Sequence, residues 1–352
     1  MKTKSLPCCP PAPGSTPAHR GPTRGAPLIT LVALVLVAAA PILLQRPFYL
    51  HLAVLVAINT IAVTGLAALT RTGQVSLCHG AFVGIGGYVS TLASMRMGLP
   101  FPLAVVAAAG ISALVALLLG LVMLRLRGVY FVLLTFAFGE FVRLVLLAWE
   151  SVTGGANGIS GIPPAEIIGY VLDSKLSFYC LAAVLALLSV GALVALFRSP
   201  AGHTIEAVGE NAALAEASGL AVRRTQHFAF TVAGAFAGLA GALLAHYIGF
   251  ISPETFQYGL SVSMIIMLVV GGRGYVLGPI VGALIMTPLP ELFRGAVQTQ
   301  NIFYGCALIL MLRFLPQGLA GLPARIAIGL RHIQAVGLLQ AVGLRHIQRG
   351  TR

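Results

Sequence analysis

Apolar runs of about 20 residues recur along nearly the whole chain, and this recurrence restricts the fold more than any other feature. A bilayer core of roughly 30 Å is crossed by about 20 helical residues, because each residue of a helix rises by about 1.5 Å. Only 9% of the residues are charged, against roughly a quarter in an average soluble domain. A soluble fold cannot solvate itself with so few charges. The sequence therefore predicts an all-α polytopic membrane protein whose solvent is the bilayer.

About ten transmembrane helices are predicted from the apolar runs and the residues that interrupt them. The predicted spans cover residues 28–44, 48–69, 77–95, 101–124, 129–148, 176–197, 228–247, 258–271, 276–291 and 300–315. The two spans near 258 and 276 are short, and a Gly-Gly-Arg-Gly sequence separates them. This spacing predicts that they are broken or re-entrant helices.

The composition divides the chain into three regions. Residues 1–27 are rich in proline and basic residues, cannot form a packed core and are predicted to be disordered. Residues 28–316 form the transmembrane domain. Residues 317–352 form a basic cytoplasmic tail, in which the sequence GLRHIQ occurs at 329–334 and again at 343–348.

The positions of Lys and Arg predict that both termini are cytoplasmic. If the amino terminus lies in the cytoplasm, most Lys and Arg fall in cytoplasmic segments, and the opposite side holds Arg46, Arg96, Lys175 and Arg294. This is the bias expected of the positive-inside rule. The net charge of +13 is scattered between apolar runs and is not gathered on one face, so no nucleic-acid partner is predicted.

Catalytic and metal-binding motifs are absent from the sequence. The five cysteines have no metal-ligand spacing, and they indicate neither a metal site nor a disulfide framework. The chain has three lysines, Lys2, Lys4 and Lys175, and none follows a glycine, so there is no Walker A loop for ATP hydrolysis. HExxH and GxSxG are absent as well. We expect a non-catalytic chain without a cofactor.

Two loops are long enough to contact a partner. In the outer loop, residues 150–175, glycines and a Pro-Pro pair favour a structured turn over a helix. In the inner loop, residues 198–227, Asn211 is suited to cap the stretch AALAEAS and Gly219 to end it. The inner loop is therefore predicted to contain a short helix at the cytoplasmic surface, where an energising partner can bind.

Glu140 and Arg143 lie deep within the predicted span at 129–148, and their i, i+3 spacing places them on one face. Charges at that depth are unfavourable unless they are paired or face a polar path. Two interpretations remain open from the sequence. The residues border a translocation pathway or a subunit contact, or they form an intrahelical ion pair that stabilises helix packing.

Glycines at GxxxG spacing, such as Gly80 with Gly84, favour close packing between transmembrane helices. The stretch CHGAFVGIGGY is denser, because it holds four glycines within eight residues, and such a density weakens a helix. We therefore predict an interrupted helix there, with backbone groups exposed to a small polar solute. The candidate residues for a pathway or for packing are His79, Gly84, Gly86 and Gly87.

Several sequences resemble the permease family of binding-protein-dependent importers for branched-chain amino acids. They are GQVSLCHGAFVGIGGY at 73–88, LRLRGVYFVLLTFAFGEFVRLV at 124–145, TGGANGISGIP at 153–163, GENAALAEASGL at 209–220, SPETF at 252–256 and LPQGLAGL at 315–322. They occur in the order typical of the family. Cys78 stands where the family usually has glycine, and His203 and Thr204 lie in a stretch that is usually more basic.

The resemblance implies a translocation subunit in a bacterial inner membrane. It implies as partners a second homologous permease, two cytoplasmic ATP-binding subunits and a periplasmic solute-binding protein. Because they form or flank the capped helix of the inner loop, the candidate residues for coupling to the ATP-binding subunits are Glu210, Asn211, Glu216 and Gly219. In the outer loop, Asn157 and Gly158 lie in a turn that is a candidate docking site for the binding protein, and loop geometry alone is the alternative explanation for them. The usual cargo of the family is leucine, isoleucine and valine, although related permeases carry urea, amides or other amino acids.

An ion-coupled secondary transporter is the main alternative. Such a transporter requires several intramembrane carboxylates to relay protons or cations. Glu140 is the one carboxylate that the predicted spans place convincingly deep. A channel or a structural scaffold would leave the capped cytoplasmic helix without a role.

Overall fold

The structure is a computed structural model that describes residues 46–126, 128–167 and 169–292, together with Gly305, Ile309 and Leu319. The predicted disordered tail at 1–27 and the predicted span at 28–44 lie outside these residues. So do nearly all of the predicted span at 300–315 and of the tail at 317–352.

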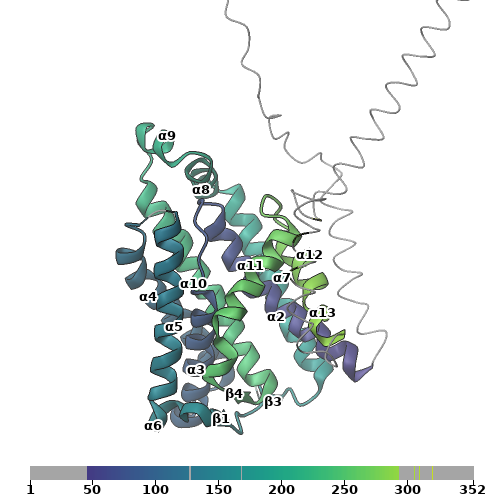
Figure 1. Ribbon diagram of the computed structural model, residues 1–352. Coiled ribbons are helices and arrows are strands. Elements are labelled where there is room, and N and C mark those ends of the chain that lie inside the picture. The colour runs from purple at the N-terminus through teal and green to yellow at the C-terminus, as the bar shows by residue number, and fades with distance from the viewer. Residues whose placement is uncertain are drawn as a thin grey trace, which may run out of the picture. The chain divides into compact units, whose positions relative to one another are not determined.

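The described part of the chain is mostly helical (Figure 1). Its helices and 3-10 turns are α2 (Pro47–Thr70), α3 (His79–Met97), α4 (Phe101–Met123), α5 (Val129–Ala148), α6 (Glu150–Thr153), η1 (Gly155–Asn157), α7 (Lys175–Arg198), α8 (Pro200–Glu210), α9 (Ala212–Ala217), α10 (Val222–Ile248), η2 (Pro253–Phe256), α11 (Tyr258–Gly271), α12 (Gly278–Met286) and α13 (Pro288–Leu292). The strands are β1 (Ile159–Ser160), β2 (Glu166–Ile167), β3 (Tyr170–Val171) and β4 (Phe250–Ile251).

Five of the described helices, α2, α4, α5, α7 and α10, are long and apolar enough to cross a membrane. The bounds of α2, α4, α5 and α7 agree closely with four of the predicted spans. Helix α10 begins at Val222, earlier than the predicted start at 228, because its polar first turns continue the helix beyond the apolar run. The described residues thus confirm an all-α membrane fold.

The two ends of the bundle differ in structure. Helices α8 and α9 lie at one end together with the turn that joins α11 to α12, whereas α6 and strands β1, β3 and β4 lie at the other (Figure 1). We call these the α8–α9 end and the strand end. At the strand end β1 pairs with β4 in antiparallel register, and β2 pairs with β3. In the loop at 150–175, which was predicted to form a structured turn, the chain thus forms the short helix α6, the 3-10 turn η1 and three short strands.

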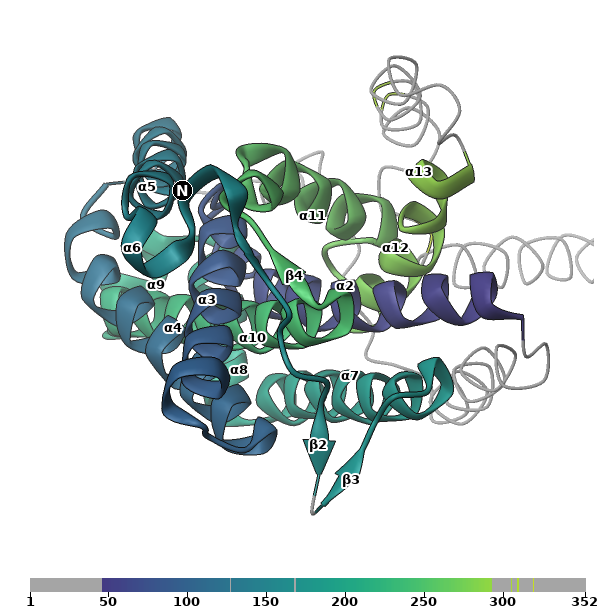
Figure 2. The same cartoon turned by 90° about the horizontal axis from the view of Figure 1, so that it is seen from below.

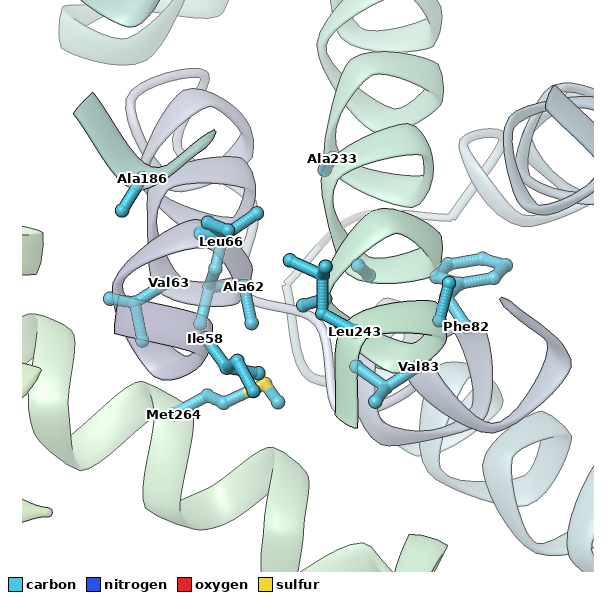
Figure 3. Packing of buried hydrophobic residues seen from close by; sticks show 14 of the residues in the cluster. Ile58, Ala62, Val63, Leu66, Phe82, Val83, Ala186, Ala233, Leu243 and Met264 are labelled. Atoms are coloured by element: carbon cyan, nitrogen blue, oxygen red, sulfur yellow. The ribbon is translucent and has the colours of Figure 1, made fainter. Parts of the chain in front are cut away.

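Helices α2, α3 and α10 form the centre of the described bundle. Side chains of α2 approach α10 from one side, and Phe82 and Val83 of α3 approach it from the other (Figure 3). In the apolar window of α2, 78% of the residues are buried, whereas the value for α5 is 11%. Helices α4, α5 and α7 are therefore peripheral, and most of their exposed side chains are apolar.

Helix α2 is flanked by α7 on one side and by α11 and α12 on the other, as Figure 2 shows. Helices α11 and α12 are short, with 14 and 9 residues. The predicted span at 276–291 is divided between α12 and α13, because α12 ends before Thr287 and α13 begins at Pro288. A proline at the first position of α13 leaves no N–H to continue α12.

The prediction of an interrupted helix in CHGAFVGIGGY is wrong, because α3 runs without a break from His79 to Met97. A segment without helical structure lies before the glycines, at residues 74–78, where the hydroxyl of Thr135 accepts the N–H of Leu77 at 3.1 Å. The low helix propensity of glycine is outweighed here by tertiary packing, since most of α3 is buried against neighbouring helices.

Candidate functional site

The short helix predicted in the inner loop is confirmed as α9. The side-chain oxygen of Asn211 accepts the N–H of Leu214 at 3.0 Å, which is an N-cap bond. Gly219 has a φ of +85° just after the helix, a conformation that glycine adopts without strain, and the N–H of Leu220 returns to the carbonyl of Ala215 at 3.0 Å. The local sequence therefore specifies both ends of α9.

Helix α9 rests on its neighbours through a small apolar cluster. Ala215 is buried with Val208 of α8 and Val222 of α10. Glu210 and Glu216, which flank this contact, are exposed to solvent, and the side chain of Leu214 is 65% exposed. Helix α9 thus presents a mixed apolar and acidic surface at the α8–α9 end.

Helix α8 was not predicted from the sequence. Its N-terminal signal was nevertheless present, because the Ser199 hydroxyl accepts the N–H of Gly202 and Pro200 occupies the first helical position. The inner loop is therefore a pair of consecutive helices, and Asn211 forms the junction between them.

Glu140 and Arg143 form an intrahelical ion pair, which is one of the two interpretations that their spacing left open. The Arg143 Nε donates to Glu140 Oε1 at 2.8 Å, and a second guanidinium nitrogen donates to the same oxygen at 2.5 Å. Arg143 also donates to Glu254 of η2 at 3.0 Å, and the Glu254 carboxylate accepts a further hydrogen bond from the Gln257 amide. The pair is therefore part of a cluster that ties α5 to η2 near the strand end.

Gly84, Gly86 and Gly87 are buried where α3 meets other elements. A Cβ added at Gly84 would lie 3.0 Å from the Phe256 ring, and one at Gly87 would lie 2.7 Å from Cδ1 of Ile251. A Cβ at Gly86 would lie 2.3 Å from the carbonyl oxygen of Gly238 in α10, which is closer than real side chains approach. Gly84 and Gly238 thus allow the close packing that their GxxxG spacing predicted, and Gly86 and Gly87 contribute to the same packing.

His79, the first residue of α3, is fully buried. Its ring lies edge-on to Phe82, with the two ring centroids 6.1 Å apart. Neither ring nitrogen has a hydrogen-bond partner within the part of the chain that the structure describes. An unpaired polar group in such a place is unfavourable, so the imidazole of His79 is a cost to the stability of the described fold.

The outer loop holds Asn157 and Gly158 at the strand end. Asn157 ends η1 and is exposed. Gly158 has a φ of +67°, and a Cβ there would lie 2.2 Å from the carbonyl oxygen of Ile251. The loop thus packs directly against β4, and Asn157 beside this contact is exposed.

The strand end also contains an open cavity of about 420 Å³ that the sequence did not indicate. Residues of α2, α7, α10 and the loop before α7 line it. The His246 Nδ1 donates to the carbonyl oxygen of Pro163 at 2.9 Å, and the Tyr247 hydroxyl lies 2.8 Å from the His51 Nδ1. None of the site residues predicted from the sequence lines this cavity.

Arg71, directly after α2, is a second feature that sequence reasoning missed. Its guanidinium donates to Glu206 of α8 at 2.7 Å and to the carbonyl of Gly274 at 2.9 Å. Burial lowers the pKa of Arg71, while the charge and hydrogen bond of Glu206 oppose that shift. No local sequence pattern predicts this contact, because Arg71 and Glu206 are 135 residues apart.

The chain is similar to known proteins over most of its length. Residues 48–315 match the family model described as branched-chain amino acid transport system / permease component. The high-affinity branched-chain amino acid transport system permease protein LivM of Escherichia coli K12 is 33% identical over 327 residues, covering 86% of this chain and 77% of that protein.

Two further relatives are more distant. The LivH permease protein of the same transport system in Escherichia coli K12 is 27% identical over 272 residues, covering 71% of this chain and 87% of LivH. The autoinducer 2 import system permease protein LsrC of Enterobacter sp. strain 638 is 30% identical over 255 residues, covering 70% of this chain and 72% of LsrC. No solved structure matches the chain.

Proposed function

This chain belongs to the family of branched-chain amino acid transport permeases, and from this premise we propose that it forms the membrane path of an ATP-driven, solute-binding-protein-dependent importer. As a permease it translocates solute, and separate partner subunits hydrolyse ATP. We propose leucine, isoleucine and valine as the cargo, because LivM, at 33% identity, is a permease protein for branched-chain amino acids.

The observation that carries this proposal is the capped helix α9, which lies within residues 48–315, the part of the chain that matches the family model. An importer permease needs a rigid element outside the membrane through which an ATP-binding subunit acts. Helix α9 meets this need, since Asn211 caps it, Ala215 anchors it and its outer residues are exposed to solvent. An ion-coupled transporter would need carboxylates for ion relay, and Glu140, which lies within α5, is neutralised by Arg143.

Uptake by the reconstituted importer tests the proposal. The chain is inserted into proteoliposomes with its second permease and ATP-binding subunits, and uptake of labelled leucine is measured with and without the solute-binding protein. We expect uptake that requires both ATP and the binding protein. Uptake driven by a proton or sodium gradient in the absence of ATP would instead support the secondary transporter.

We propose that the protein lies in the bacterial inner membrane with about ten spans and with both termini cytoplasmic, so that the α8–α9 end faces the cytoplasm. Arginines at that end support this orientation, including Arg71, Arg198 and Arg223, whereas the strand end carries Arg96 and Lys175. Labelling of single cysteines with a membrane-impermeant reagent tests the orientation. A cysteine at Asn157 should react from the periplasm.

We propose that the solute-binding protein docks on the outer loop at Asn157 and Gly158. The loop suits this role because the β1–β4 pair holds it in one position while Asn157 remains exposed. Replacing Asn157 with Trp should weaken binding of the solute-binding protein and leave assembly with the ATP-binding subunits intact. Unchanged binding would remove Asn157 from the docking site.

We propose that the face of α5 with Glu140 and Arg143 borders the pathway between this chain and a second permease. The exposed side chains along α4 are apolar, as lipid requires, whereas α5 carries a charge cluster whose members are partly exposed. Lipid solvates charges poorly, so a polar path or a protein partner is the favourable neighbour. Two ATP-binding subunits complete the proposed assembly.

A further inference from the structure

The side chain of Arg71, the residue that follows α2, contacts three other parts of the fold. Its Nη1 donates to Glu206 of α8 at 2.7 Å, and its Nη2 donates to the carbonyl of Gly274, in the turn between α11 and α12, at 2.9 Å. The central carbon of its guanidinium lies 3.9 Å from the centroid of the Phe197 ring in α7. The side chain is only 11% exposed.

The main chain of Arg71 contacts α8 as well. A Cβ added at Gly209 would lie 1.8 Å from the carbonyl oxygen of Arg71, so α8 packs directly on the backbone at the end of α2. Glu206 and Gly209 are three residues apart and therefore lie on one face of α8. Helix α8 cannot move away from α2 without separating both contacts.

The chemistry of arginine suits this junction. Its planar guanidinium presents donors in a fixed fork and stacks on aromatic rings, so one side chain can bind a carboxylate and a carbonyl while covering Phe197. Lysine has one compact charge and no planar surface. A lysine at this position keeps the charge but cannot make all three contacts together.

We propose that Arg71 is a positioning residue that transmits the displacement of α8 and α9 to α2 and to the α11–α12 turn. This inference rests on the proposed function, in which the ATP-binding subunits act on α9. Helix α2 is the long apolar helix with the largest buried share, and α11 and α12 pack against it. A displacement of Arg71 would therefore also displace α2, at the centre of the described bundle, and the short helices α11 and α12.

The test uses the complete importer in proteoliposomes and compares Arg71→Lys with Arg71→Ala. The measured quantity is solute taken up per ATP hydrolysed, together with stimulation of ATP hydrolysis by the loaded binding protein. We expect this ratio to fall about tenfold in Arg71→Ala, a factor within the usual range of coupling between distant sites. Arg71→Lys should fall less, because it retains the ion pair with Glu206.

Arg198→Ala is the matched control for the loss of a positive charge. Arg198 ends α7, is exposed, and forms no hydrogen bond or ion pair with the residues that the structure describes. Its loss changes the charge on the same side of the membrane without touching the junction. The coupling ratio of Arg198→Ala should equal that of the wild type.

Glu206→Gln provides a second approach in case Arg71→Ala fails to insert. Glu206 has a side chain that is 48% exposed, so its amide variant should fold. We expect its coupling ratio to fall, but by less than in Arg71→Ala, because the amide variant weakens only one of the three contacts of Arg71. The double variant should be no worse than Arg71→Ala alone, since Glu206 acts through Arg71. Normal coupling in Glu206→Gln and Arg71→Lys would overturn the inference. Absence of ATP-dependent uptake in the wild type would instead overturn the proposed function.

Discussion

Gly86 of α3 and Gly238 of α10 pack backbone against backbone, so that a Cβ at Gly86 would lie 2.3 Å from the Gly238 carbonyl oxygen. The contact joins two of the three central helices. It explains why a glycine-rich stretch, which would weaken an isolated helix, forms one here. A side chain at this point must separate α3 from α10.

Gly86→Ala should destabilise the permease by about 1–3 kcal/mol, because the added methyl group overpacks a closed contact. Thermal unfolding in detergent and abundance in the membrane measure the effect. Gly110→Ala is the control, since a Cβ at Gly110 in α4 meets no atom within 4 Å. Uptake per inserted molecule should stay near normal. Lost uptake with normal stability and abundance would assign Gly86 to the solute path instead.

Arg143→Ala should be more damaging than the double change Glu140→Gln with Arg143→Ala. Removing Arg143 alone leaves the carboxylates of Glu140 and Glu254 without their shared cation. We expect a difference of about 1–2 kcal/mol, smaller than for a fully buried pair because the cluster is partly exposed. Adding Glu254→Gln should restore further stability. Equal unfolding temperatures for the single and double variants would contradict the pairing argument.

Alanine at Glu210, Asn211 and Glu216 together should uncouple ATP hydrolysis from transport without preventing insertion. The change removes two exposed carboxylates and the cap of α9, which by itself stabilises a helix by about 1 kcal/mol. Uptake and ATP hydrolysis are measured at equal protein level.

Single changes at Asn211 separate the effect of the α9 cap from the effect of the two carboxylates. Serine caps helices as well as asparagine does, so Asn211→Ser keeps the cap. It should retain coupling, whereas Asn211→Ala should lose part of it. Normal uptake in the triple variant would show that this surface of α9 does not transmit the effect of ATP.

His79→Leu should stabilise the fold by about 1 kcal/mol and reduce uptake. The replacement removes two buried ring nitrogens that have no partner within the described chain, and such groups are unfavourable in an apolar surrounding. Unfolding temperature and uptake are measured on the same preparation. Loss of stability would indicate that the imidazole is needed for packing. Unchanged uptake would remove His79 from the translocation pathway.

The amino-acid sequence by itself determined the class of fold, the bounds of α2, α4, α5 and α7, and the short helix α9 with its cap. These features depend on neighbours within a few residues, since hydropathy and capping are local properties. The i, i+3 pair of Glu140 and Arg143 was predictable for the same reason. Helix α8 was also predictable, because Ser199 is a typical N-cap residue and Pro200 is typical of a first helical position.

The tertiary structure alone decided which distant residues meet. Arg143 and Glu254 are 111 residues apart in sequence, and neither carries a local signal for the other. The contact of Arg71 with α8 and the unbroken course of α3 likewise depend on elements brought together by packing. Propensity is a weak preference of each residue, and burial against α10 supplies a larger free energy, so helix α3 forms where its glycines predicted an interruption.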